Sequence, residues 1–399
     1  MSRRILITGG SIAGNATAAL LGRHGFDVTV VERAAAFRDG GQNVDVRGVG
    51  REVLRRMGLE QAALDRGTGE EGTVWVDENG REAARFAADD IDGDGPTAEM
   101  EILRGDLARL LHDAVQGRAT YRFGDHIAAI DDDPDAAIVT FASGMTERYD
   151  LVIVAEGVGS ATRELVFPHE NASRWMNLTL AYFTIPRTAG DDRMWRWYNA
   201  PGKRSVSLRP DRQGTTRAML SLSKAAEGEQ DWSVARQKAF LRERFADAGW
   251  ETPRILSAME GADDFYFDVL RQVRMNRWSN ARVVLTGDAA WCATPLSGIG
   301  TTLAIVGAYV LAGELAATED HAAAFASYER IVRPFVKQGQ SVPKIVPRLL
   351  WPHTRAGLAV MRGAMRLAAT PLLRKAISQS FARNANAIEL PRYKTIAAE

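Results

Sequence analysis

The chain has 399 residues, of which 46% are hydrophobic and 25% are charged. These values are ordinary for globular proteins and exclude a disordered or fibrous chain, and the length favours two or three domains. Acidic and basic residues balance at 50 each, whereas nucleic-acid-binding proteins usually carry a basic excess, so we expect no nucleic-acid partner. A single cysteine, Cys292, excludes an internal disulfide, and with only six scattered histidines we predict no metal site.

The N-terminal segment predicts a strand, a helix and a second strand. Residues 4–7 form an apolar run that stops at glycines, a helix follows from about Ile12 to near Gly25, and residues 28–32 form another apolar run. A strand, a glycine turn, a helix and a strand within about 30 residues make a βαβ unit with a parallel sheet. The first apolar run is too short for the core of a signal peptide, so we expect a cytoplasmic protein.

The middle of the chain predicts further strands and a change of composition. Asp77 to Gly80 is a hairpin turn signal between strand-like residues 73–76 and 82–86, and a later apolar run covers 151–155. Residues 173–270 hold five of the nine tryptophans among strand-like runs. We therefore expect a separate β-rich domain in that segment.

The segment between Asp288 and Glu314 carries no charged residue and is long enough to span a bilayer. It also contains Pro295 and four glycines, with serine and threonine among them. We interpret it as a loop that leads into a buried helix, and we expect no membrane association.

The first glycine-rich motif follows the first strand and opens the first helix. In it Gly9 makes the tight turn, Gly14 permits close packing of helix and strand, and the helix N-terminus offers N–H groups to a pyrophosphate. Ser11 stands where the G-x-G-x-x-G pattern has its middle glycine. Glu32, at the end of the second strand, is placed to accept hydrogen bonds from ribose hydroxyls. The alternative is a plain βαβ unit without a ligand.

Two more motifs follow strands later in the chain. Glu156-Gly157 comes after the run at 151–155, and Gly287-Asp288 comes after the run at 283–285. The second of these continues into a glycine-rich loop and a helix from about Thr301. Asp288 could accept from a polyol, and the N–H groups at 298–302 favour a group that gains negative charge.

In this order the three motifs resemble those of the class A FAD-dependent monooxygenases, which have the p-hydroxybenzoate hydroxylase fold, and in particular the tetracycline-destructase branch. The resemblance covers residues 4–315 and the C-terminal helices in outline. It implies an α/β fold with a Rossmann-like FAD-binding domain, a β-sheet substrate domain and C-terminal helices. The FAD-binding domain would have two parts, residues 1–172 and 271–318. The substrate domain would cover 173–270, with strands near 72–100 contributing to it. The C-terminal helices would cover 319–399.

The resemblance also implies roles for individual residues. Glu32 would hold the adenosine ribose with Arg33 beside the adenine. Arg104 would contact the cofactor near its ribityl chain and phosphates, and Asp45 and Asp288 would contact the ribityl chain. Pro295 to Thr302 would line the flavin ring, with Pro295, Gly298 and Gly300 nearest to it. The full set of cofactor-binding residues is Gly9, Ser11, Gly14, Glu32, Arg33, Asp45, Arg104, Asp288, Pro295, Gly298, Gly300 and Thr301.

This chain departs from the family pattern at three points. Glu156 stands where the family has aspartate, Trp291 where it usually has histidine, and Ile299 where it has glutamine. A single dinucleotide fingerprint agrees with an FAD that stays bound and an NADPH or NADH that visits briefly. Arg38 resembles in position an arginine that meets NADPH in the destructase branch, and its alternative is a solvated surface arginine.

Two aromatic runs are candidates for the substrate wall. Trp195 and Trp197 are two residues apart, so they share one face of a strand, and Phe265 and Phe267 would face the same cavity. The first run is similar to a motif of flavin-dependent halogenases but lacks its Ile-Pro, and the two tryptophans could simply be core. An aromatic cavity would suit a flat, apolar substrate, including a polycyclic one.

The C-terminal segment from 341 carries ten basic and two acidic residues, a local charge of +8. Residues 353–383 place Leu358, Met361, Met365 and Ala369 on one helical stripe. We expect this segment to dock on the protein's own two domains rather than on a membrane.

Taken together, the motifs and the resemblance predict an FAD-dependent monooxygenase. It would use non-covalent FAD, NADPH or NADH, and O₂ to insert one oxygen atom into a hydrophobic small molecule through a C4a-hydroperoxyflavin, with no catalytic side-chain base. The alternatives are an FAD-dependent oxidase, dehydrogenase or halogenase, and a flavin-fold protein that binds a metabolite without turnover.

Overall fold

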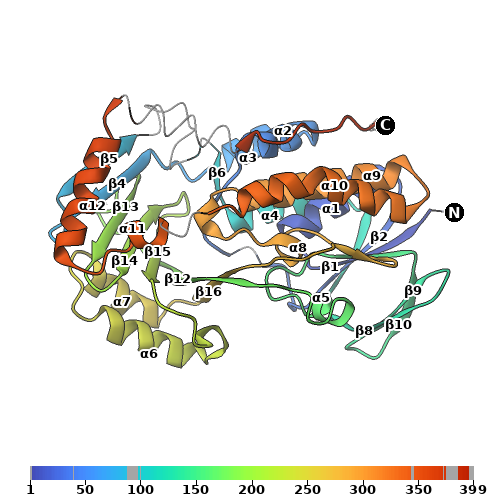
Figure 1. The fold of residues 1–399 in the computed structure, drawn as a ribbon, viewed down its shortest axis with the longest axis horizontal. Helices are drawn as coiled ribbons and strands as arrows, with labels where there is room; N and C mark the ends of the chain where they lie inside the picture. Colours follow the sequence, from blue (N-terminus) through green and yellow to red (C-terminus); the bar gives the residue numbers. More distant parts are fainter. Residues whose placement is uncertain are drawn as a thin grey trace.

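The structure is a computed structural model that describes residues 2–38, 40–87, 98, 100–342, 346–371, 373 and 385–394. Two large sheets lie at opposite ends of an elongated molecule (Figure 1). The strands β12 (Arg174–Pro186) and β16 (Tyr266–Gln272) run from the second sheet toward the first. A site that uses both parts of the chain must lie where these two bodies meet.

The first sheet is built on the predicted βαβ unit. β1 (Arg4–Thr8) pairs in parallel with β2 (Asp27–Glu32), and α1 (Ile12–Arg23) connects them. The order across the sheet is β17 (Ser279–Asn280), β18 (Val283–Leu285), β11 (Leu151–Val154), β1, β2 and β7 (Ala119–Phe123). Since β1, β11 and β18 are parallel neighbours, the three glycine-rich motifs follow strand ends at the same edge of the sheet.

The uncharged segment forms the central helix of this body, as predicted. α9 (Gly300–Ala317) is buried along most of its length and packs against α1 and against α10 (His321–Gly339). Among the described residues it is the one helix long and apolar enough to cross a membrane by length and composition alone. Its burial inside the protein explains its apolar sequence.

Smaller elements complete this half of the molecule. They are β3 (Asn43–Asp45), α2 (Val49–Arg56), α3 (Glu60–Asp65), β6 (Glu101–Leu103), α4 (Arg104–Asp113), β8 (Ile127–Asp132), β9 (Ala137–Phe141), β10 (Thr146–Tyr149), α5 (Ala161–Val166), α8 (Asp288–Trp291) and the 3₁₀ turn η3 (Pro295–Ser297). Strands β8 to β10 form a separate three-stranded sheet, and β3 pairs with β6.

The second sheet has seven strands. Their order is β16, β12, β15 (Thr215–Leu222), β14 (Arg204–Pro210), β13 (Met194–Ala200), β4 (Gly72–Val76) and β5 (Glu82–Ala87). β4 and β5 form the predicted hairpin, and β4 joins β13 in parallel, so an early segment completes a sheet built from the middle of the chain. Residues 88–97 and 99, within the range 72–100 expected to contribute strands, lie outside the described residues.

Two faces of this sheet have different neighbours. The outer face packs Phe183, Leu220 and Val269 against α6 (Val234–Phe245) and α7 (Thr252–Glu260), which follow the short turn η2 (Glu229–Asp231). The opposite face carries Leu180, Met219, Leu270, Tyr182 and Trp197, and Leu296 of η3 packs against it. We call it the inner face, because it is turned toward the glycine-rich loop of the first body.

The C-terminal elements contact both bodies (Figure 1). After α11 (Val346–Leu350), α12 (Arg355–Ala368) packs beside β5, and Arg366 donates to the carbonyl of Ala83 at 3.0 Å. Of the apolar stripe predicted for this helix, Leu358 and Met361 are buried. Residues 385–394 return to the first body, where the carbonyl of Pro391 accepts from Tyr309 at 2.9 Å. Residues 372 and 374–384, part of the predicted helix, lie outside the described residues.

Candidate functional site

The fingerprint turn has the close backbone approach that its glycines predict. Gly9 has φ +103° and lies against the carbonyl of Ala155, so a Cβ there would clash with backbone. A Cβ on Gly14 would collide with the carbonyl oxygen of Gly9. Both positions therefore require glycine, and the N-terminus of α1 comes as close to the end of β1 as a phosphate-binding turn needs.

Glu32 lies at the end of β2, beside this turn. One of its carboxylate oxygens accepts from the Gly10 N–H and the other from the Ala34 N–H, both at 2.9 Å. A carboxylate oxygen has more than one acceptor position, so each can still receive a ribose hydroxyl. The next residue, Arg33, is exposed, as is Arg38.

Arg104 lies beside the fingerprint turn. It opens α4, where its guanidinium donates to the Ser11 hydroxyl at 3.1 Å and lies against Gly41. Gly41 has φ +132°, and a Cβ there would come within 2.9 Å of the guanidinium Nε. Burial lowers the pKa of Arg104, and the positive charge of Arg38 is among the smaller causes, so Arg38 lies within electrostatic range of it.

Asp45 occupies the end of β3. One of its oxygens pairs with Arg47 at 2.9 Å, and the other, Oδ1, is buried without a hydrogen-bond partner among the described residues. The Arg47 N–H donates to the Thr302 hydroxyl at 3.0 Å, which ties this segment to the start of α9. An unpartnered buried oxygen beside a helix start fits a polyol donor such as a ribityl hydroxyl.

Asp288, the first residue of α8, lies deep in the molecule while its side chain stays accessible to solvent. It therefore lines an open space and not packed core. Burial raises the pKa of this carboxyl to about 6, partly opposed by the charge of Arg104. Asp288 and Arg104, two of the residues that the resemblance assigns to the ribityl chain, are thus electrostatically coupled.

The loop from Pro295 to Thr301 presents backbone to its surroundings. Gly298 has φ +66°, and a Cβ on either Gly298 or Gly300 would meet nothing within 4 Å. Gly300 and Thr301 begin α9, so the first N–H groups of that helix are available for an electron-rich partner. A flat ring has room to approach this loop closely.

Two buried glutamines, which the sequence analysis missed, hold the start of this loop. The Gln340 amide donates to the carbonyls of Val273 at 2.7 Å and Trp291 at 3.2 Å. Gln272 donates to the carbonyl of Gln340 at 3.0 Å. Neither residue belongs to a local motif, because each reaches the loop from a different element, β16 or the end of α10.

Glu156 has a structural role in the second motif. Its carboxylate accepts from the hydroxyls of Thr8 at 2.6 Å, Ser160 at 2.7 Å and Thr162 at 2.6 Å, and from the Thr162 N–H at 3.0 Å. Burial alone would raise its pKa, but these donors outweigh burial and lower it. The longer side chain thus joins the end of β1 to the start of α5.

The aromatic candidates divide between the two faces of the second sheet. Trp197 lies on the inner face and packs 4.9 Å from Trp195, ring centre to ring centre. Phe265 and Phe267 do not face this side, contrary to our expectation. They pack with Phe183 on the outer face, under α6 and α7. The alternation of side chains along β16 instead turns Tyr266 and Asp268 to the inner face.

A buried ion cluster supports Trp195, and no sequence motif indicated it. Arg209 lies 3.8 Å from the centre of the Trp195 ring and pairs with Glu70 at 2.9 Å and Glu101 at 2.6 Å. Burial would lower the pKa of Arg209, but attraction to the two carboxylates raises it. Burial also raises the pKa of Glu70 well above its ordinary range.

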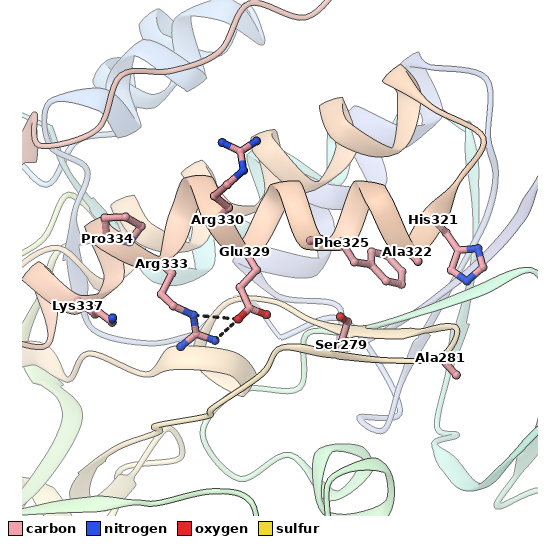
Figure 2. A pocket seen from close by; sticks show the side chains of 11 residues that line it. Ser279, Ala281, His321, Ala322, Phe325, Glu329, Arg330, Arg333, Pro334 and Lys337 are labelled. Atoms are coloured by element: carbon pink, nitrogen blue, oxygen red, sulfur yellow. Dashed lines mark hydrogen bonds and ion pairs between the residues drawn. The ribbon is translucent and has the colours of Figure 1, made fainter.

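One surface groove lies away from these residues. It has a volume of about 720 Å³ and runs between α10 and β17, at the edge of the first sheet. Figure 2 shows Phe325 beside it and the ion pair of Glu329 with Arg333 at 2.6 Å. None of the predicted site residues lines it.

Comparisons with known proteins agree with this geometry. A family model described as an FAD binding domain matches residues 3–340. The FAD-dependent monooxygenase asL4 of Sarocladium schorii is 35% identical over 396 residues, which cover 92% of each chain. The monooxygenase CTB7 of Cercospora beticola is also 35% identical and covers 98% of each chain.

Solved structures share the fold over nearly the whole chain. The tetracycline destructase Tet(51) superposes with a TM-score of 0.83 at 32% identity and covers 99% of this chain and 100% of its own. Klebsiella pneumoniae HpxO with bound FAD and uric acid has a TM-score of 0.78 at 19% identity, which shows the fold alone, and covers 95% of this chain and 96% of its own. The chain belongs to the class A FAD-dependent monooxygenases and is an FAD-binding oxidoreductase.

Proposed function

We propose that this flavoenzyme uses NADPH or NADH and O₂ to insert one oxygen atom into a hydrophobic, aromatic or polycyclic small molecule. The observation that supports this most is the meeting of two surfaces. The glycine-rich loop, through Leu296, packs directly on an inner face that carries Trp197, Tyr182 and Tyr266.

The residues at the fingerprint fit FAD. The turn at Gly9 and Gly14 would receive the pyrophosphate, and Glu32 the adenosine ribose with Arg33 beside the adenine. Arg104 would contact the ribityl chain and phosphates, and Asp45 and Asp288 the ribityl chain. Bound FAD supplies hydride acceptance and oxygen activation, and the protein supplies orientation and water exclusion. The N–H groups from Gly298 to Thr301 would stabilise negative charge on the ring.

The inner face would orient the substrate. Trp195 is held by Arg209, and Trp197 is held between Trp195 and Trp75, whose ring lies 6.4 Å away. Rigid aromatic side chains provide a flat apolar wall at low entropic cost. Such a wall favours planar substrates over flexible chains.

Arg38 is proposed to meet the nicotinamide cofactor. It is exposed, and its charge acts on Arg104, so it stands at the entrance to the FAD residues. Arg38→Ala should raise the KM for NADPH several-fold with little effect on FAD affinity, as steady-state oxidation measured in air would show. An unchanged KM for both NADPH and NADH would show that Arg38 does not contact the nicotinamide cofactor.

The proposal as a whole is tested with FAD-loaded protein. NADPH and NADH oxidation is followed in air while flat aromatic compounds are screened. The masses of the products formed under ¹⁸O₂ are then measured by mass spectrometry. We expect a substrate that accelerates NAD(P)H consumption and gains one ¹⁸O atom. Substrate oxidation without ¹⁸O would instead identify a dehydrogenase or oxidase.

A further inference from the structure

A group of buried polar side chains joins the two bodies at the β3–β6 pair. Asp45 is the cross-strand partner of Glu101, and Asn43 lies two residues before Asp45, so all three share one face of this pair. From the second sheet, β14 brings Arg209 and the carbonyl of Pro210 against this face. The Asn43 amide donates to that carbonyl at 3.3 Å, and Arg209 pairs with Glu101 at 2.6 Å.

The acids that hold Arg209 are fixed in place. The Glu101 carboxylate, whose side chain is 3% exposed, accepts from the Thr68 hydroxyl at 3.0 Å and from the Asn43 amide at 2.5 Å. The second acid, Glu70, has a fully buried side chain and accepts from the Arg209 Nε at 2.9 Å. With two fixed acceptors, the planar guanidinium has little freedom to rotate.

The same guanidinium contacts the substrate wall. It lies 3.8 Å from the centre of the Trp195 ring, and Trp195 in turn packs 4.9 Å from Trp197. A planar guanidinium stacks on an aromatic face, whereas the ammonium group of lysine is a compact point charge. The negative charge of Asp45 also acts on Arg209. Arg209 therefore stands between a residue proposed to meet FAD and a residue proposed to meet the substrate.

Stability alone is a weak explanation for these buried charges. Burying charges costs free energy, and apolar residues of similar volume often stabilise a protein as well as a buried ion pair does. A buried pair is satisfied only in the geometry that brings donor and acceptor together, so it selects one arrangement of the groups around it. Here that arrangement places the Trp195 ring against the β3–β6 pair.

We propose that Arg209 is a positioning residue that fixes the orientation of the Trp195 ring relative to the β3–β6 pair and its FAD residue Asp45. The inference rests on the proposed function, because it treats Trp195 as part of the substrate wall. Arg209 acts through Trp195 and is itself held by Glu101.

The orientation of Trp195 is measured by near-ultraviolet circular dichroism of FAD-loaded protein, because indole rings in contact give a signal that depends on their mutual angle. Trp195→Leu defines the contribution of this ring. Arg209→Lys keeps the charge and removes the planar group, and Glu101→Gln removes the charge that holds Arg209. We expect Arg209→Lys to lose most of the Trp195 contribution and Glu101→Gln to lose part of it, while the Tm and the FAD affinity stay close to those of the parent.

A second measurement asks whether Arg209 acts through Trp195. Binding of 9,10-anthraquinone, a flat apolar probe, is measured by equilibrium dialysis of FAD-loaded protein without NAD(P)H. Arg209→Lys should weaken binding several-fold in the parent and should have no further effect in Trp195→Leu. Arg236→Lys is the matched control, because Arg236 is exposed on α6 and lies 4.0 Å from the Trp232 ring, and it should leave probe binding unchanged.

The inference is overturned if Arg209→Lys keeps the Trp195 contribution, or if it weakens probe binding equally with and without Trp195. If Arg209→Lys does not fold, the same circular dichroism readout in Glu101→Gln decides, and an unchanged Trp195 contribution there overturns the inference. A parent protein that does not bind the probe would instead contradict the proposed substrate wall, because the circular dichroism of Trp195 needs no bound probe.

Discussion

Asp288 and Arg104 are the two side chains on which FAD affinity should depend most. Both lie deep in the molecule, where burial raises the pKa of Asp288 and lowers the pKa of Arg104. Burial therefore favours the neutral form of each side chain, because neither charge has the full compensation that a bound partner would give. Asp288→Ala and Arg104→Ala should each weaken FAD binding by about ten- to a hundred-fold, because each removes a charge-assisted hydrogen bond. Titration of apoprotein by flavin fluorescence measures this effect.

Exposed residues of the same types serve as controls. Asp263→Ala and Arg66→Ala change side chains at the surface and should bind FAD like the parent protein. Thermal unfolding of the apoproteins checks that the site variants remain folded. If both site variants bound FAD like the parent, the assignment of these residues would be wrong.

Glu156 should matter for stability. Its carboxylate accepts four hydrogen bonds at the junction of β1 and α5, and Glu156→Ala would leave those donors without this acceptor. We expect a loss of about 2–4 kcal/mol in the free energy of unfolding, whereas Glu243→Ala at an exposed position of α6 should change little.

The pH dependence of this loss has a definite sign. Because the pKa of Glu156 is lowered in the folded protein, its ionisation stabilises the fold above the ordinary glutamate pKa. That contribution is lost as pH falls through the folded-state pKa. The difference between Glu156→Ala and the parent in urea unfolding should therefore shrink in acid. A difference that grew in acid would contradict the hydrogen-bonding account.

The positions of the candidate site residues were predictable where one short segment carries the motif. Gly9, Gly14, Arg104 and Asp288 each lie in a motif whose spacing reports a strand end or a helix start. Phe265 and Phe267 were misplaced because a one-residue offset along β16 moves every side chain to the other face, and the sequence does not reveal that register. The sequence did not indicate Gln272 and Gln340, because they act through contacts between segments that are distant along the chain.

At the level of elements, α9 is packed too tightly at Gly307 to accept a larger residue there. A Cβ on Gly307 would come within 2.7 Å of the Trp291 ring, which is itself held 4.4 Å from the Trp278 ring. Gly307→Ala should therefore destabilise the protein by about 1–3 kcal/mol despite the higher helix propensity of alanine.

Gly363 in α12 is the counterpart for that substitution, because it is exposed and a Cβ there would meet nothing within 4 Å. Gly363→Ala should stabilise the protein by about 0.5–1 kcal/mol. Chemical denaturation of both variants measures the change in the free energy of unfolding that each substitution causes. Equal effects would show that Trp291 moves freely and that α9 is not a rigid support for the loop.

Elements with a strong period were predicted individually, whereas composition predicted only that residues 173–270 would be β-rich, which β12 to β16 confirm. The βαβ unit, the β4–β5 hairpin and the buried α9 follow from apolar runs bounded by glycine. The tryptophan-rich segment was expected to be β-rich, yet it also contains α6 and α7. Tryptophan content reports burial, and helices that cover a sheet bury aromatic residues as well as strands do.

For the whole molecule, the C-terminal segment joins the two bodies. Trp351 donates to Ser221 on the inner face at 2.8 Å, Arg362 pairs with Glu78 at 3.3 Å, and Tyr393 donates to Glu314 of α9 at 2.7 Å. Truncation at about residue 340 should lower the Tm and impair substrate-stimulated turnover. Full-length protein should stay in the supernatant when anionic vesicles are pelleted at physiological salt. Robust co-pelleting would favour membrane binding by this basic segment.

The central claim is that the junction of the two bodies holds one FAD without a covalent bond. The single cysteine, Cys292, is buried, and burial raises the pKa of its thiol well above the ordinary range, which disfavours the reactive thiolate. Acid precipitation of FAD-loaded protein, with the flavin in supernatant and pellet quantified by absorbance, is the most direct test. We expect one FAD per chain, all of it released to the supernatant. Flavin retained in the pellet, or a protein that takes up no FAD, would contradict it.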